Sequence, residues 1–158
     1  MQTPQQSDDP GSAAGPDLGR RLGYVLKQAQ SALRSRMDHD LRPLGLTVPQ
    51  YACLELLRTE SLTSAELARG MFVTAQSMNG VVQSLQERGL VARADTAPSG
   101  RRRPAALTET GRELLAEADT RVRRIEAQMI GALDPEGADQ MVDGLAVIAT
   151  TLRRDDRG

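Results

Sequence analysis

Residues 74–84 carry short, uncharged side chains whose hydrogen-bonding groups could read the edges of base pairs. The predicted reading set is Thr74, Gln76, Ser77, Asn79, Gly80 and Gln83. A Gln or Asn side chain can form two hydrogen bonds with one adenine, at N6 and N7, and Ser can hydrogen-bond to several base edges in the major groove. An ordinary solvated face is the alternative, but such faces usually carry Lys and Glu, and this segment has neither before Glu87.

A second set of polar groups lies in a turn-rich segment further along the chain, where three consecutive arginines follow a glycine. The predicted set is Ser99, Arg101, Arg102 and Arg103. Cations at the tip of a loop suit contact with phosphates or insertion into a narrow minor groove. Arg88 and Arg93 flank the same unit, so we expect a basic edge here, with a solvated run of charge as the alternative.

Groups for catalysis or metal binding are scarce. The chain has one histidine, His39, and one cysteine, Cys53, which leaves no evident nucleophile–base pair and no cysteine-rich metal site. We therefore expect no enzymatic activity, no metal and no cofactor. We interpret Cys53 as a buried thiol that packs as a small hydrophobe, with a redox sensor as the alternative, and His39 as a surface or interface residue.

Composition and charge narrow the class of protein further. The 158 residues suit one domain, and a formal net charge of −1 excludes a uniformly basic surface but not a local basic patch. Aromatic residues make up 2% of the chain, which argues against binding by base stacking. No apolar run approaches the roughly 20 residues of a membrane span, and the N-terminus lacks the pattern of a signal peptide. We expect a cytoplasmic protein with no membrane partner.

Long helices are expected towards both ends of the chain. Residues 1–16 show no apolar periodicity and are expected to form a disordered tail. Apolar residues then recur at three- and four-residue steps over residues 17–41, which predicts a long amphipathic helix. Two further long helices are expected after Thr108 and after Asp134, each of which can cap a helix.

Short helices and strands are expected in the middle of the chain. The predicted caps of the short helices are Thr47, Thr63 and Thr74. Helices over 63–70 and 74–88, ended by glycines, have the proportions of a helix-turn-helix. Short strands over 90–94 and 104–107 would form a hairpin whose tip holds the arginines. The predicted fold class is therefore mainly α with a small β-hairpin.

Several short motifs stand in a specific order between Leu62 and Leu115. They are LTSAELA at 62–68, LQERGLV at 85–91, GR at 100–101 and LTETG at 107–111. In this order and spacing the stretch resembles the winged helix-turn-helix of the multiple-antibiotic-resistance regulator (MarR) family, and the order of helices extends the resemblance to roughly residues 17–155. The resemblance implies a homodimer on double-stranded DNA. Its recognition helices would enter successive major grooves of a pseudo-palindrome, and its wings would reach the flanking minor grooves.

Two departures from the family pattern concern the wing and the recognition helix. Ser99 stands where members often carry Asp, and Gly80 or Ser84 stands where they often carry Arg. That Asp and such an Arg commonly brace each other, so the wing of this chain must be held otherwise or be looser. Gly80 costs about 1 kcal/mol in a helix relative to Ala, and the expected benefit is close backbone approach to DNA.

The terminal helices carry more apolar surface than a small winged domain could cover. The predicted dimer-interface residues are Leu18, Leu22, Val25, Ile125, Met129, Leu145, Ile148 and Leu152. A monomeric helical core is the alternative, but interdigitation with a second copy explains the excess better, and a symmetric dimer suits a palindromic site. We assign residues 17–46 and 109–155 to a helical dimerisation region and 47–108 to a winged helix-turn-helix DNA-binding domain.

The resemblance also implies an effector cleft between the dimer helices and the DNA-binding lobe. The residues carried over to it are Arg36, Met37, His39, Arg42 and Tyr51. Arg or His could hold an anion, and Met and Tyr would supply apolar contact, so the expected ligand is a small aromatic or anionic molecule. The sequence thus predicts a ligand-responsive transcriptional regulator, a repressor released from its operator by an effector. The alternative is a helical protein-interaction module that uses a winged fold without binding DNA.

Overall fold

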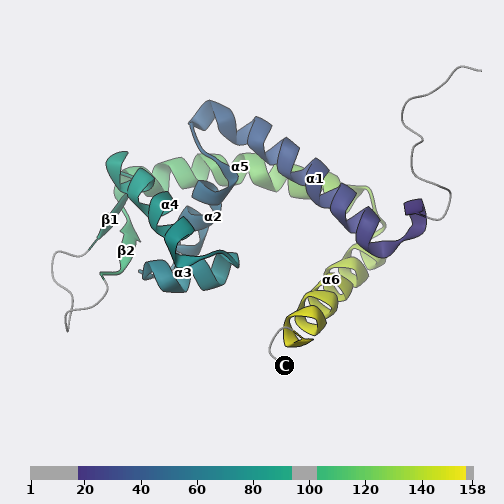
Figure 1. Cartoon of the computed structure of the whole chain (residues 1–158). Helices are drawn as coiled ribbons and strands as arrows, with labels where there is room; N and C mark the ends of the chain where they lie inside the picture. Colours follow the sequence, from purple (N-terminus) through teal and green to yellow (C-terminus); the bar gives the residue numbers. More distant parts are fainter. Residues whose placement is uncertain (1–17, 94–102, 156–158) are drawn as a thin grey trace, which may run out of the picture. The chain divides into compact units, whose positions relative to one another are not determined.

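The structure, a computed structural model, describes residues 18–93 and 103–155 (Figure 1). Its helices are η1 (Leu18–Arg20), α1 (Leu22–Leu41), η2 (Arg42–Leu44), α2 (Val48–Leu56), α3 (Ser64–Met71), α4 (Ala75–Glu87), α5 (Glu109–Gly131) and α6 (Pro135–Asp155). Its strands are β1 (Val91–Arg93) and β2 (Ala105–Leu107). The chain divides into two compact units, Met1–Arg36 and Met37–Gly158. The predicted fold class, mainly α with a small hairpin, is confirmed.

The helix caps lie where the sequence placed them. Each cap side chain accepts a hydrogen bond from the backbone N–H three residues further on, and the caps are Thr47, Thr63, Thr74, Thr108 and Asp134. At Thr47 and Thr63 the bond is reciprocal, since the side chains of Gln50 and Glu66 accept from the backbone N–H of the cap. Such bonds satisfy amide donors that have no partner within the helix, so these five positions fix where helices begin.

One predicted helix end is wrong by a residue. We expected Gly70 to terminate the first helix of the helix-turn-helix, but α3 continues to Met71 and Phe72 takes the left-handed conformation with φ 55°. Gly70 is used for packing instead, because a Cβ there would lie 3.0 Å from Cδ1 of Leu56. The end of α4 follows the prediction, with Arg88 as the cap and Gly89 at φ 69°.

The two strands form the predicted antiparallel hairpin. Val91 pairs with Leu107, Ala92 with Ala106, and Arg93 with Ala105 in the last rung. Leu62, just before α3, adds an isolated bridge: its N–H donates to the carbonyl of Ala105 at 3.0 Å, and its carbonyl accepts from Ala105 N–H at 2.7 Å. Strand β2 therefore lies between β1 and the segment that leads into α3.

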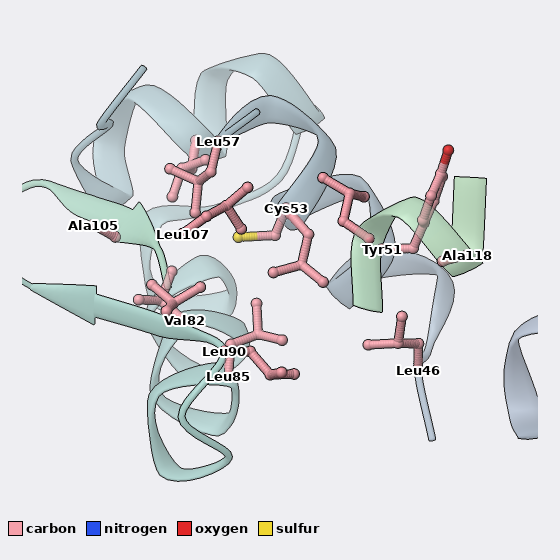
Figure 2. Packing of buried hydrophobic residues seen from close by; sticks show 14 of the residues in the cluster. Leu46, Tyr51, Cys53, Leu57, Val82, Leu85, Leu90, Ala105, Leu107 and Ala118 are labelled. Carbon is pink, nitrogen blue, oxygen red and sulfur yellow. The ribbon is translucent and has the colours of Figure 1, made fainter. Parts of the chain in front are cut away.

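One hydrophobic core joins α2, α3, α4, the hairpin and the first half of α5 (Figure 2). Its fully buried side chains are Leu41, Cys53, Leu54, Leu67, Met78, Val82 and Leu85. The interpretation of Cys53 as a buried thiol is confirmed, and burial raises its pKa to about 12, so the thiol stays protonated at neutral pH. Gly111 brings α5 close to the end of α4, because a Cβ there would lie 2.0 Å from the carbonyl oxygen of Leu90.

Candidate nucleic-acid interface

Helix α4 presents two opposite faces because its apolar residues recur at helical spacing. Met78, Val82 and Leu85 are fully buried against the core, and Thr74 caps the helix by accepting a bond from Ser77 N–H at 3.1 Å. The other face holds the predicted reading residues. All six are exposed, namely Thr74, Gln76, Ser77, Asn79, Gly80 and Gln83.

Two of these exposed positions have particular geometry. The side chain of Gln83 donates to Oε1 of Glu87 at 3.1 Å, so a base contact would replace that bond. A Cβ built at Gly80 meets nothing within 4 Å, so nothing in the described residues requires glycine at this place. The absence of a packing reason is consistent with the expected close approach to DNA.

Three further residues that we placed on or beside the reading edge are engaged within the lobe. Ser84 is half-buried, and its hydroxyl accepts a bond from Gln50 Nε2 at 3.0 Å. Arg88 donates to the carbonyl oxygens of Gly45 at 2.7 Å and Leu44 at 3.3 Å. Arg93 is also half-buried and hydrogen-bonded. Arg88, although exposed, and the half-buried Arg93 both donate to groups inside the fold, and their predicted place on a basic edge stays a prediction.

Only part of the predicted wing set lies in the described chain. Ser99, Arg101 and Arg102 lie outside the described residues, and their predicted DNA contacts stay predictions. Arg103 is described, and it is exposed two residues before the final rung of the hairpin at Ala105. It therefore lies at the loop end of the hairpin, just before β2, the strand that pairs with both β1 and Leu62.

The predicted effector residues are in unlike environments. Arg36 and His39 are exposed, and Arg36 belongs to the first compact unit whereas the other four belong to the second. Met37 is half-buried and packs against the core. Tyr51 is buried, its hydroxyl donates to Oδ1 of Asp119 at 3.4 Å, and burial raises its pKa to about 12.

A pocket of about 330 Å³ lies where the end of α1 turns into α2. Its lining residues are Asp38, Arg42, Gly45, Leu46 and Thr47. Of the predicted effector residues it contains only Arg42. The predicted residues were chosen along helix faces, whereas the pocket forms around a turn that the left-handed Gly45, at φ 65°, makes possible. The turn also lies in contact with α4, because Arg88 donates to its carbonyls.

A polar cluster that the sequence did not reveal joins α2 to α5. Asp119 on α5 accepts from Tyr51 and from Nε of Arg123 at 2.8 Å, and it lies 3.4 Å from Nη2 of Arg58. Arg58 also bonds Glu55 through two nitrogens, and that bond is the main reason its pKa is raised. Residues 51 and 119 are far apart in sequence, so no local pattern could have indicated the contact.

The predicted dimer-interface residues are mostly uncovered in the single chain. Those that are exposed are Leu22, Val25, Met129, Leu145 and Leu152. Ile148 is half-buried, and the side chain of Leu18 lies outside the described residues. Ile125 differs from the others because it is already buried in the single chain, with 4% of its surface exposed.

Neither metal-binding clusters nor membrane spans occur in the part of the chain that the structure describes. No three His, Cys, Asp or Glu side chains come together there in a way that could hold a metal ion. No described helix is long and apolar enough to cross a membrane.

The order of elements defines the class of protein. A short helix, a turn, a second helix with a polar outer face and a hairpin paired to the segment before the first helix make a winged helix-turn-helix, a DNA-binding architecture. The family model described as the MarR family matches residues 44–102. The HTH-type transcriptional repressor Rv2887 of Mycobacterium tuberculosis is 43% identical over 113 residues, which cover 71% of this chain and 81% of that protein. The chain belongs to the MarR family of DNA-binding transcriptional regulators, and it is not an enzyme.

Solved structures of two family members are similar to this chain. Rv2887 in complex with DNA has a TM-score of 0.66 at 36% identity, covering 81% of this chain and 97% of the other. Its complex with salicylic acid has a TM-score of 0.64 at 40% identity, covering 79% and 96%. The repressor CouR on a 23-mer DNA duplex has a TM-score of 0.79 at 29% identity, covering 85% and 96%. CouR from Rhodococcus jostii bound to p-coumaroyl-CoA has a TM-score of 0.74 at 29% identity, covering 84% and 94%.

Proposed function

We propose that this regulator is a cytoplasmic homodimer that represses transcription by occupying a pseudo-palindromic operator, and that a small aromatic or anionic effector releases it. The observation that carries the proposal is the outer face of α4. From Thr74 to Gln83 its exposed side chains carry no charge and most can form hydrogen bonds, with Glu87 at the end of the helix, whereas the stripe beneath them is fully buried. A rigid helix with such a face can present Gln76, Ser77 and Asn79 to base edges in a major groove.

The uncovered apolar side chains support the homodimer. Helix α6 exposes Met141, Val142, Val147 and Leu152, and apolar patches of this kind are typical of protein interfaces. A two-fold dimer would place two copies of α4 about one helical turn of DNA apart, which matches a palindromic operator. In this proposal residues 17–46 and 109–155 dimerise, and residues 47–108 bind DNA.

The relatives and the pocket support an effector. Rv2887 has been solved with salicylic acid, an aromatic acid, and CouR with p-coumaroyl-CoA, which carries an aromatic acyl group. In this chain Arg42 supplies a cation to the pocket beside Gly45 and Thr47. An effector that prefers a state with displaced α4 helices would lower operator affinity by the ratio of its affinities for the two states.

A mobility-shift titration with the gene's own upstream DNA tests DNA binding. We expect a retarded band at low salt that weakens as salt rises, because phosphate contacts release counterions. Asn79→Ala should raise the dissociation constant about fivefold or more, since a bidentate base contact contributes about 1–3 kcal/mol. The exposed Gln140 on α6 gives the matched control Gln140→Ala, which should bind as the unmodified protein does.

Two outcomes would overturn parts of the proposal. A folded protein that retards no upstream fragment at low salt would favour the protein-interaction module. Salicylate is the probe for release, and millimolar salicylate should weaken the retarded band. If neither salicylate nor a coumaroyl thioester changes the dissociation constant, the aromatic-acid effector is wrong while repression itself still stands.

A further inference from the structure

Arg93 lies at the loop end of the hairpin, where the paired strands stop. It is the last residue of β1 and pairs with Ala105 in the final rung. Ala105 in turn bridges Leu62 in front of α3. The hairpin has three rungs, and a hairpin this short contributes little order by itself. Side chains beside the last rung are therefore needed to hold this end of the hairpin to the lobe.

The guanidinium group of Arg93 connects the hairpin to both helices of the helix-turn-helix. Its Nε donates to Oε1 of Gln86 in the last turn of α4, at 3.1 Å. Its Nη2 donates to the hydroxyl of Ser64, the first residue of α3, at 2.9 Å. The guanidinium plane is rigid, so satisfying both acceptors fixes the strand in position and in rotation.

The burial of Arg93 distinguishes this arrangement from a simple phosphate contact. Arg93 is half-buried, whereas Arg103, the described arginine on the other side of the hairpin loop, is exposed. An arginine that served a phosphate alone would not need acceptors from two helices at once.

We infer that Arg93 is a positioning residue that holds the loop end of the hairpin to α4 and α3, so that base reading by α4 and DNA contact by Arg103 occur as one rigid unit. The inference rests on the proposed operator binding. It predicts that the two contacts are coupled: a recognition helix seated in the major groove places Arg103 at the backbone or the flanking minor groove without a further ordering step. Without the Arg93 bonds, α4 should still be able to contact bases, but the hairpin should no longer be held to α3 and α4.

A double-mutant cycle on operator binding tests the coupling. The proteins are the unmodified chain, Arg93→Ala, Arg103→Ala and the double variant, with fluorescence anisotropy measured at several salt concentrations. In the unmodified background, Arg103→Ala should raise the dissociation constant about fivefold and lower the salt slope by about one, as expected for one phosphate contact. In the Arg93→Ala background, the same change should cost less than about twofold, since partners in one network are not additive.

Further variants separate positioning from direct contact. Gln86→Ala removes one acceptor but no charge, and it should weaken the effect of Arg103→Ala in the same way. Arg93→Lys keeps the charge but loses the planar fork, so it should not rescue the coupling. Arg112→Ala removes one positive charge from an exposed pair with Glu109 and should leave the cycle unchanged, because such pairs contribute little.

The outcomes are distinguishable from a failure of the proposed function. If Arg93→Ala and Arg103→Ala lower affinity independently, and Gln86→Ala has no effect, Arg93 is a plain phosphate contact and the inference is overturned. If Arg93→Ala does not fold, as judged by circular dichroism, Gln86→Ala combined with Ser64→Ala decides the question. If the unmodified protein shows no preference for the upstream DNA over a scrambled duplex, the operator proposal itself has failed.

Discussion

Most large apolar side chains between Leu41 and Ile125 are buried, apart from Phe72 and Val73 in the turn before α4, whereas most of those between Met129 and Leu152 are exposed. In the first stretch, Leu41 and Leu85 are fully buried and Ile125 is 4% exposed. In the second stretch, Met129 is 49% exposed and Leu152 is 64% exposed. The change falls within one helix, since Ile125 and Met129 are one turn apart on α5.

The apolar core of the first stretch is covered within the chain, whereas most apolar side chains of the second stretch are exposed. The first stretch has caps, a continuous core and hydrogen bonds such as that of Thr108 Oγ1 to the carbonyl of Gly89 at 2.7 Å. The second has the apolar stripe of a core helix, and most of that stripe is not covered by any of the described residues. Exposed apolar area of this extent is stabilised by association, which is why we attribute reading to the first stretch and assembly to the second.

The largest expected effect is the loss of stability that Gly111→Val should cause in the stretch from Leu41 to Ile125. A Cβ at this position would lie 2.0 Å from the carbonyl oxygen of Leu90, a backbone atom that cannot move aside without shifting the end of α4. We expect a loss of about 3 kcal/mol or more in unfolding free energy, measured by urea titration. Gly131→Ala is the matched change, because a Cβ there meets nothing within 4 Å. A stable Gly111→Val protein would show that the junction of α4 and α5 is looser than described.

The next effect should fall on assembly alone, through Leu145→Glu combined with Leu152→Glu. Both side chains are exposed in the single chain, so the lobe should remain folded, whereas charge in an apolar interface opposes association. Sedimentation should show a monomer, and operator affinity should fall on the order of a hundredfold because one half-site is lost. A variant that stays dimeric would move the interface elsewhere.

A smaller effect tests the structural role of Arg88. Its two bonds to the carbonyls of Gly45 and Leu44 tie the end of α4 to the turn before α2. Arg88→Ala should lower the unfolding free energy by about 1 kcal/mol, the usual value of such hydrogen bonds. The salt slope of operator binding should stay the same. A slope reduced by one without a loss of stability would show that Arg88 contacts a phosphate and has no structural role.

The last effect appears only at alkaline pH and concerns the buried thiol of Cys53. The pKa of Cys53 is raised from 9.0 to about 12 in the folded chain, so the unfolded chain loses this proton first. Its contribution to stability is complete below pH 9 and is lost progressively as pH rises from 9 towards 12. Cys53→Ala should therefore show a shallower loss of unfolding free energy between pH 8 and 11 than the unmodified protein. Equal slopes would mean that the thiol is accessible to water.

Features that depend on residues close together in the sequence could be predicted, whereas contacts between residues far apart in the sequence could not. The caps at Thr47, Thr63 and Thr74 were predicted because a cap and its amide lie three residues apart. Phe72 in the left-handed region was missed because Gly70, the better residue for that conformation, is needed beside Leu56.

The features of the candidate site show the same difference between local patterns and long-range contacts. The exposed face of α4 followed from helical periodicity, since burial of Met78 and Val82 forces the intervening polar residues outwards. The hydrogen bonds of Arg88 and Arg93 did not follow from any sequence pattern. A count of charges does not reveal acceptors such as the carbonyl of Gly45, which lies 43 positions before Arg88. Arg93 also offers an answer to the missing brace, because its bonds to Gln86 and Ser64 hold the loop end of the hairpin.

The central claim is that two copies of one reading lobe occupy one palindromic site, and hydroxyl-radical footprinting on the upstream DNA tests it most directly. The account predicts two protected segments, related by symmetry and about 10–10.5 base pairs apart from centre to centre, with further protection in the flanking minor grooves. A single protected segment, or uniform protection without symmetry, would contradict it.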